Sequence, residues 1–347
     1  MSGNKSAQLI CIGNAMVDVF AEVPADFCKR FALALPVQHV DYKTAAAVLD
    51  ALPSDKVVTS GGGAANTAKI AAHLGIPSAF IGAAGSDPFG ILFEEELKRS
   101  GVNVLLARKK SPTGFFICIT NKTPGKKNPE KDTNDSFRYI VASASAALEL
   151  DAGDIDEAVF SQGSIPQVLF LEGFILDKEP LVTRVLELVE KFRLTVAIDP
   201  GTAEIAARQG NLVKQGTSPF WDKQLRHSNF PLLLFFNETE AEAFAAVLGT
   251  HNQPALSDWE NLFVKASRDS SDVIAVKQAE RGAVVFSGGR VYHVKAEPVQ
   301  AAESTGAGDA FAAGFIASWL RGMGPEECGL SGNNTAALVL QAPGTLL

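Results

Sequence analysis

A glycine-rich segment followed by a carboxylate lies near the end of the chain. Thr305-Gly306-Ala307-Gly308-Asp309 directly precedes an apolar run that begins at Ala310. Small residues at the start of a helix leave several backbone N–H groups free to point at one place, where the helix dipole favours an anion. Asp309 cannot bind an anion, but it can accept a proton beside one. The segment therefore predicts a phosphate site with an adjacent base, as phosphoryl transfer to a hydroxyl requires.

A second glycine cluster, Gly61-Gly62-Gly63-Ala64-Ala65-Asn66, precedes another helix-like pattern. Glycine lets the backbone approach a ligand closely, and the amide of Asn66 can both donate to and accept from hydroxyl groups. Asn14 and Asp18, just after the first predicted strand, add further groups of this kind. These residues predict a site for a hydroxylated substrate. The alternative is a tight turn that enters a helix, with Asn66 as an internal polar residue.

Asn237 and Glu240 follow a strongly apolar run at a predicted strand-to-helix junction. An amide and a carboxylate three residues apart can hold phosphate oxygens and Mg²⁺-bound water at the mouth of a cleft. The alternative interpretation is an asparagine cap with acidic residues in the first helical turn.

Several common site types are excluded by their missing residues. The chain contains no G-x-x-x-x-G-K-[ST] segment, so it is not a P-loop enzyme. Phe311 stands where a dinucleotide-binding fingerprint requires its third glycine, which argues against a dehydrogenase. The five histidines show no metal-ligand spacing.

Composition indicates a globular protein with a sizeable core. Hydrophobic residues make up 46% of the 347 residues and charged residues 20%, and the formal net charge of −8 argues against a nucleic-acid partner. No stretch approaches the roughly 20 apolar residues of a membrane span, and the first residues lack the apolar core of a signal peptide. The scattered cysteines indicate reduced thiols, and hence a cytoplasmic protein. They are Cys11, Cys28, Cys118 and Cys328.

Short apolar runs alternate with helical patterns along most of the chain. This alternation predicts an α/β fold of three layers, in which helices cover both faces of a mostly parallel sheet. The predicted strands are Leu9–Ile12, Ala79–Gly82, Val168–Leu171, Thr195–Ile198, Leu232–Phe236 and Val273–Val276. The predicted helices are Ala64–Leu74, Gly90–Arg99, Leu181–Phe192, Glu238–Leu248 and Ala310–Arg321. Ligands of such sheets bind beyond the carboxyl ends of the strands.

Other strand-like segments do not alternate with helices. They are Val17–Val23, Val57–Ser60, Val102–Arg108, Gly114–Thr120 and Phe137–Val141. We expect them to form a small separate sheet that lies over the cleft as a lid, with strands drawn from about 17–24, 35–60 and 102–141. The segment Asn121–Ser136 is rich in Lys, Asn, Asp, Pro and Gly, and it is predicted to be a loop.

Taken in order, the motifs resemble those of the ribokinase/PfkB family of carbohydrate and nucleoside kinases over nearly the whole chain. Gly61-Gly62-x-x-x-Asn66 is similar to the family's first signature, and Thr305-Gly306-Ala307-Gly308-Asp309 to its second, highly specific one. Asn237-x-x-Glu240 matches a third family motif. The resemblance implies a single ribokinase-like domain over residues 1–347 and an ATP-dependent kinase that uses Mg²⁺, with K⁺ as a further activator.

The resemblance also implies a role for each matching residue. Asp309 is then the catalytic base, and Gly306, Ala307 and Gly308 form the anion hole. Asn237 and Glu240 organise Mg²⁺ through water. The residues implied in binding the acceptor substrate are Asn14, Asp18, Gly61, Gly62, Asn66 and Arg138. The residues implied in binding ATP are Asn237, Lys277, Gly282 and Asn334.

Asn14-x-x-x-Asp18 and the segment from Ser331 to Asn334 resemble the adenosine kinase branch. This predicts transfer of the γ-phosphoryl group to a primary hydroxyl of a nucleoside. Gly63, however, replaces a serine common in that branch. A kinase of free ribose, fructose or a ketodeoxy sugar acid therefore remains an alternative, as does a non-catalytic binding protein of the same fold. Exposed edges of the lid sheet could pair two chains as a homodimer.

Overall fold

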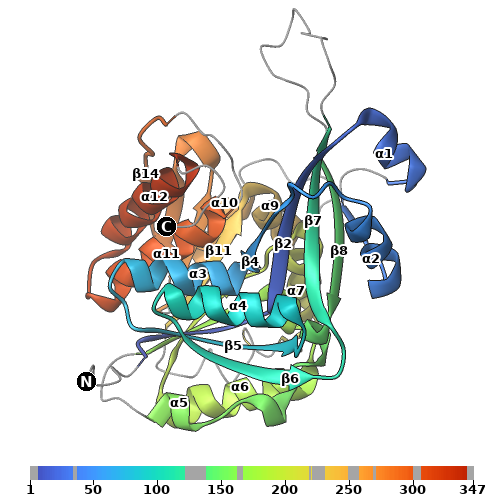
Figure 1. The fold of residues 1–347 in the computed structure, drawn as a ribbon. Helices are drawn as coiled ribbons and strands as arrows, with labels where there is room; N and C mark the ends of the chain where they lie inside the picture. Colours follow the sequence, from blue (N-terminus) through green and yellow to red (C-terminus); the bar gives the residue numbers. More distant parts are fainter. Residues whose placement is uncertain are drawn as a thin grey trace, which may run out of the picture.

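The chain forms two β-sheets with their helices in the computed structural model (Figure 1), which describes residues 7–33, 37–121, 138–161, 167–218, 220, 231–248, 258–268, 271–299 and 306–341. Within these residues the larger sheet has nine strands in the order β14-β13-β12-β11-β10-β9-β1-β5-β6. Their bounds are β1 Leu9–Ile12, β5 Ser78–Gly85, β6 Asn103–Lys109, β9 Val168–Glu172, β10 Thr195–Asp199, β11 Leu232–Asn237, β12 Val273–Lys277, β13 Ala283–Ser287 and β14 Arg290–Val294.

The large sheet is parallel from β6 to β12 and antiparallel only where β13 and β14 are added. All six strands predicted from apolar runs belong to it, which confirms the mostly parallel α/β fold. Alternate residues of each strand enter two separate hydrophobic cores: Leu9 and Cys11 of β1 pack on one face, Ile10 and Ile12 on the other. Continuous apolar runs are therefore required, because both faces are covered by helices.

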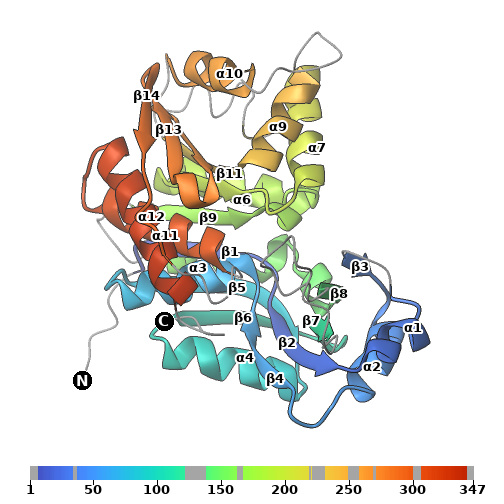
Figure 2. The same cartoon turned by 90° about the horizontal axis from the view of Figure 1, so that it is seen from above.

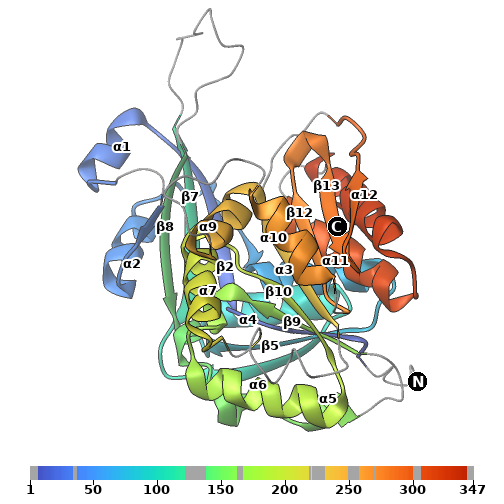
Figure 3. The ribbon, with the colours of Figure 1, turned by 180° about the vertical axis from the view of Figure 1, so that it is seen from behind.

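Helices cover each face of the large sheet (Figures 1 and 3). One core contains residues of α3 Gly63–His73, α4 Pro88–Arg99, α11 Ala307–Leu320 and α12 Pro325–Gln341. The other contains residues of α5 Ala158–Ser161, α6 Glu179–Phe192, α7 Ala203–Gln215, α9 Glu238–Leu248 and α10 Asp258–Ser267. The predicted three-layer arrangement is confirmed.

The smaller sheet has five strands in the order β3-β8-β7-β2-β4 within the described residues. Their bounds are β2 Met16–Val23, β3 Val37–His39, β4 Val57–Gly61, β7 Thr113–Asn121 and β8 Arg138–Ser145. Helices α1 Ala25–Arg30 and α2 Tyr42–Asp50 lie on the side of this sheet that faces away from the large sheet (Figure 2). The separate small sheet expected from the sequence is thus present, apart from one strand.

The placement of Val102–Arg108 in the small sheet was wrong. These residues form β6, which pairs in parallel with β5 at the edge of the large sheet. The reason is the helix that precedes them: β5, α4 and β6 form a β-α-β unit, and such a crossover returns the chain to the same sheet. The predicted loop 121–136 lies almost wholly outside the described residues. Among the described helices, none has the length and apolar character that crossing a membrane requires.

Candidate active site

Four polar residues stand in a row at the carboxyl edge of the large sheet. Glu172, Asp199, Asn237 and Lys277 are the last residues of the neighbouring strands β9, β10, β11 and β12. In register, Asp199 pairs with Glu172 and Lys277 pairs with Asn237. Parallel strands bring their carboxyl ends to one edge, where ligands of α/β folds bind. Sequence reasoning identified Asn237 and Lys277 but missed Glu172 and Asp199.

The first turn of α11 lies close to this row. Gly306 caps the helix in the left-handed region (φ 79°), a conformation that favours glycine. The first hydrogen bond of the helix runs from the Ala310 N–H to the Gly306 carbonyl at 2.9 Å. The preceding N–H groups have no partner within the helix and are available to an anion, as the sequence predicts. Residues 303–305 lie outside the described part of the chain.

Asp309 joins the two glycine clusters, which are more than 240 residues apart in the sequence. The Asn66 Nδ2 group donates to Asp309 Oδ2 at 2.9 Å. A Cβ atom at Gly63 would lie 3.1 Å from Asp309 Oδ1. A side chain at residue 63 would therefore crowd the second carboxylate oxygen. The packing of α3 against α11 thus places the predicted base beside the predicted hydroxyl-binding amide.

Desolvation by burial raises the pKa of Asp309 to about 7. The hydrogen bond from Asn66 lowers the pKa, while the negative charge of Asp199 raises it and the positive charge of Lys277 lowers it. An acid–base group works best when its pKa is near the working pH, so this environment suits a general base.

The glycines next to Asp18 and Asn14 allow close backbone packing. A Cβ atom at Gly61 would lie 2.2 Å from the Asp18 carboxyl carbon. Gly62 has φ 97°, and a Cβ atom there would lie 2.5 Å from the Asn14 carbonyl oxygen. A side chain at residue 61 would displace the Asp18 carboxyl group, and one at residue 62 would collide with backbone. The structure thus brings together five of the six predicted acceptor-binding residues: Asn14, Asp18, Gly61, Gly62 and Asn66. The side chain of the sixth, Arg138, the first residue of β8, lies outside the described part.

Two charged side chains that sequence reasoning missed, the buried Lys69 and the half-buried Glu96, hold the end of β4. Lys69 Nζ donates to the Ser60 carbonyl at 3.2 Å and to the Ser60 hydroxyl at 3.0 Å. Glu96 accepts from the Ser60 N–H at 2.6 Å and from the Thr59 hydroxyl at 3.1 Å. Edge strands have unpaired backbone groups, and here helices α3 and α4 supply the partners. The position of Gly61 is therefore tied to the large-sheet half of the molecule.

Glu172 joins the first strand to the second glycine cluster. Its Oε2 atom accepts from the Asn14 N–H at 3.2 Å and from the Ala64 N–H at 3.3 Å. Burial raises the pKa of this carboxyl to about 7, although both backbone hydrogen bonds lower it. Its only sequence signal is its place directly after an apolar run.

Asn237 and Glu240 form a reciprocal helix cap. The Glu240 N–H donates to Asn237 Oδ1, and the Asn237 N–H donates to Glu240 Oε2, both at 2.8 Å. This is a capping box, so the alternative interpretation of the pair is confirmed for both residues. The bonds leave Glu240 Oε1 and Asn237 Nδ2 for other contacts. In the described part of the chain, no cluster of three or more His, Cys, Asp or Glu side chains could hold a metal ion.

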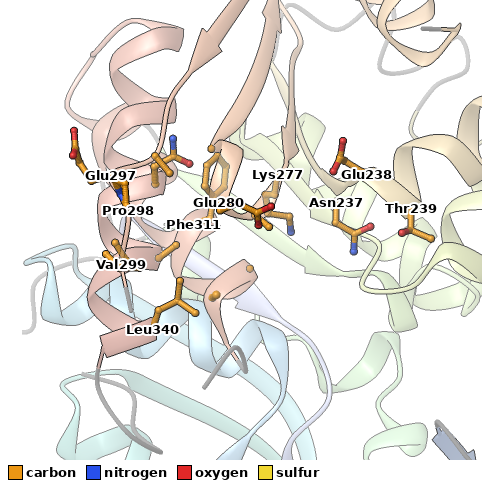
Figure 4. A pocket seen from close by; sticks show the side chains of 18 residues that line it. Asn237, Glu238, Thr239, Lys277, Glu280, Glu297, Pro298, Val299, Phe311 and Leu340 are labelled. Carbon is orange, nitrogen blue, oxygen red and sulfur yellow. The ribbon is translucent and has the colours of Figure 1, made fainter. Parts of the chain in front are cut away.

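A cavity of about 580 Å³ opens beside the first turn of α11 (Figure 4). Apolar side chains such as Phe311 and Leu340 line one part of it, and Asn237 and Lys277 line it where the strands end. Gly282 also lines it, with φ 95° and the Val294 carbonyl only 2.1 Å from a would-be Cβ atom. Three of the four predicted ATP-binding residues therefore line one cavity.

Asn334, the fourth predicted ATP-binding residue, is exposed on α12 and is absent from the cavity lining. Its neighbour Asn333 lines the cavity instead, and its Nδ2 group donates to the carbonyls of Val294 at 3.0 Å and Lys295 at 3.3 Å. Adjacent residues of a helix point about 100° apart, and the sequence alone does not give the rotation of α12.

We expect thermal stability to decrease as the pH rises from 5 to 7. Burial raises the pKa of Glu172, Glu240 and Asp309 to about 7 in the folded chain, whereas unfolded carboxyl groups titrate near pH 4. Between pH 5 and 7 the folded state therefore binds more protons than the unfolded state. The free energy of unfolding decreases as the pH rises and these protons are released. Melting curves across this range test the sign. A melting temperature that rises with pH throughout would contradict the burial of these groups.

Comparisons with known proteins agree with the fold and the motifs. Residues 31–149 and 201–347 match the profile described as pfkB family carbohydrate kinase. Adenosine kinase 2 of Arabidopsis thaliana is 24% identical over 366 residues, covering 99% of this chain and 96% of the plant protein. A fructokinase of Salmonella typhimurium is 26% identical over 290 residues, covering 78% and 81%. The structure of adenosine kinase from Sinorhizobium meliloti has a TM-score of 0.76 at 23% identity, covering 99% of this chain and 97% of that one, which shows a shared fold.

Proposed function

The chain belongs to the pfkB family of carbohydrate kinases, and we propose that it transfers the γ-phosphoryl group of ATP to a primary hydroxyl group of a nucleoside. Members of this family are phosphotransferases with an alcohol group as acceptor. The observation that carries the proposal is the position of Asp309. The Asp309 carboxylate accepts a hydrogen bond from the Asn66 amide. Asp309 also belongs to the first turn of α11, and this turn lines the cavity.

In the proposed reaction, Asp309 accepts the proton of the acceptor hydroxyl as its oxygen attacks phosphorus. The Asn66 Nδ2 group holds the carboxylate in place. The Asn66 Oδ1 atom is buried without a hydrogen-bond partner among the described residues, and a substrate hydroxyl would supply the missing donor. The free N–H groups at the start of α11 stabilise the charge on the transferring group. We assign the anion hole to Gly306, Ala307 and Gly308.

We propose that the cavity binds ATP, with the base near Phe311 and the phosphates near Lys277. Its apolar part, around Phe311 and Leu340, suits a flat base, and the part around Lys277 combines an ammonium group with the start of a helix. Glu240 and Asn237 would act on Mg²⁺ through water, using the two atoms that the capping box leaves. When bound, Mg²⁺ would neutralise charge on the phosphate oxygens.

A nucleoside is favoured over a free sugar by Phe174. This side chain follows β9 by two residues, at the same sheet edge as Glu172, and is 38% exposed. An exposed aromatic ring beside a ligand site offers a surface on which a base can stack. The free-sugar alternative is supported by Glu172, a carboxylate next to Asn14 that suits a polyhydroxylated substrate. A further alternative is a binding protein of this fold without activity.

A coupled ADP-release assay across adenosine, other nucleosides, ribose, fructose and ketodeoxy sugar acids tests these alternatives. We expect the highest kcat/KM with a nucleoside. Phe174→Ala is expected to raise the nucleoside KM about tenfold, because base–aromatic stacking contributes ~1–3 kcal/mol. The same variant should leave any activity on ribose unchanged, and Leu330→Ala, which removes another exposed side chain, serves as control. A preference for a free sugar would overturn the nucleoside assignment, and absence of ADP release with every acceptor would overturn the kinase.

We also propose that the small sheet is a lid that closes over the acceptor and excludes water, which would otherwise accept the phosphoryl group. Arg138 would reach the cleft from this lid. The edge at β3 could pair two chains as a homodimer, and K⁺ could activate the enzyme. A cytoplasmic location is in keeping with the four cysteines, which are buried and free.

A further inference from the structure

Lys277 places a positive charge at the start of α11. Its Nζ atom forms an ion pair with Asp199 Oδ2 at 2.6 Å, and the two side chains are only 15% and 13% exposed. A Cβ atom at Gly308 would lie 3.3 Å from the same Nζ atom. The ammonium group therefore touches the helical turn whose N–H groups are free. The fold thus adds a cation to the anion site that the sequence predicts at this turn.

The surroundings keep this lysine charged. Burial alone would lower the pKa of Lys277, but the carboxylates of Asp199 and Glu240 outweigh that effect and raise it. A buried ion pair contributes little to stability, because removing both charges from water offsets their attraction. The pair is thus poorly explained as a stabilising contact. Its position in the lining of the cavity points to a role in binding an anion.

We propose that Lys277 is a catalytic cation that contacts the transferring phosphoryl group, and that Asp199 is a positioning residue that holds its ammonium group in place. This role rests on the proposed kinase function. Asn237 and Lys277 pair in register on neighbouring strands, so their side chains leave the sheet on the same side (Figure 4). A phosphoryl group bound to the N–H groups of the α11 turn would therefore also meet the Lys277 ammonium group.

The charge of Lys277 matches the charge that moves during transfer. The bond between the γ-phosphorus and the bridging oxygen breaks, and its electron pair stays on ADP. The acceptor oxygen forms the new bond to phosphorus, and its proton passes to Asp309. In the transition state, negative charge is spread over the oxygens of the transferring group and the bridging oxygen. A fixed ammonium group stabilises that charge without giving up a proton.

The test compares Lys277→Met, Lys277→Arg and Asp199→Asn with the unmodified chain. We expect Lys277→Met to lower kcat about 10²–10³-fold and to abolish the tighter binding of the non-hydrolysable ATP analogue AMP-PNP relative to ADP, measured by calorimetry. The KM of the acceptor should stay within about twofold. Lys277→Arg should recover part of kcat, because it keeps the charge. Asp199→Asn should shift the alkaline limb of the kcat profile to lower pH, because the lysine loses a partner that raises its pKa.

Lys109→Met is the matched control. Lys109 pairs with Asp154 at 2.7 Å, with side chains 16% and 19% exposed, but at the far edge of the large sheet. This variant should keep kcat and both nucleotide affinities. If Lys277→Met does not fold, the double variant Lys277→Met/Asp199→Asn removes both buried charges and carries the same expectations. Unchanged kcat and an unchanged ratio of AMP-PNP to ADP affinity in a folded variant would overturn the proposal. Absence of activity in the unmodified chain would instead overturn the kinase function.

Discussion

Asp309→Asn is expected to lower kcat by about 10²–10⁴-fold while leaving the affinities for both substrates nearly unchanged. Asparagine has the same shape as aspartate, and its carbonyl oxygen can still accept from Asn66 Nδ2. It cannot accept the hydroxyl proton, however. Steady-state kinetics and calorimetry with ATP and the best acceptor separate the two effects. In the unmodified enzyme, kcat should fall toward acidic pH as Asp309, whose pKa is about 7, becomes protonated. The residual kcat of Asp309→Asn should not show this fall.

The same substitution is expected to make the protein more stable at pH 8. Because burial raises the pKa of Asp309, the ionised carboxylate costs folding free energy above that pKa, and a neutral amide does not. Active sites commonly show this opposition between activity and stability. Asp50→Asn, on the exposed end of α2, is the control and should change neither kcat nor the melting temperature. A folded Asp309→Asn enzyme with unchanged kcat would remove Asp309 from the mechanism.

Gly61→Ala is expected to lower kcat/KM for the acceptor by about 10²-fold, the usual effect of moving a substrate-positioning group by about 1 Å. A methyl group at this position would lie 2.2 Å from the Asp18 carboxyl carbon, so the carboxyl group must move. The backbone at residue 61 has little freedom to compensate, because Lys69 and Glu96 hold the neighbouring Ser60. The KM for ATP should change little, since the cavity is lined by other elements.

Gly324→Ala provides the control for this substitution. Its added Cβ atom would meet only the end of the Glu327 side chain at 3.6 Å, an ordinary contact. Both variants should fold, as judged by circular dichroism and melting temperature. If Gly61→Ala changed the KM for ATP and not that for the acceptor, the residues assigned here to the acceptor site would belong to the ATP site.

The fold was largely predictable because parallel strands covered on both faces are continuous apolar runs. Val168–Leu171 and Leu232–Phe236 are such runs, and both are central strands. Strand β14 was missed because most of its side chains are exposed, so it does not form an apolar run. Strand β13 was missed although Ala283–Phe286 are apolar and buried. The strand β6 was recognised but assigned to the wrong sheet, because its partner depends on the crossover through α4 and not on its own residues.

For the candidate site, the sequence determined the motifs and the chemistry that they allow: a glycine-rich turn before a helix with Asp309 behind it, and a second cluster ending in Asn66. Both signals are local, since backbone freedom and side-chain chemistry belong to neighbouring residues. Only the tertiary structure brought Asn66 to Asp309, and Asp199 and Lys277 to the same turn. A carboxylate or lysine directly after an apolar run is only a weak local signal, because many such residues have no part in a site. Its meaning depends on strand register and helix packing, which are set by the whole chain at once.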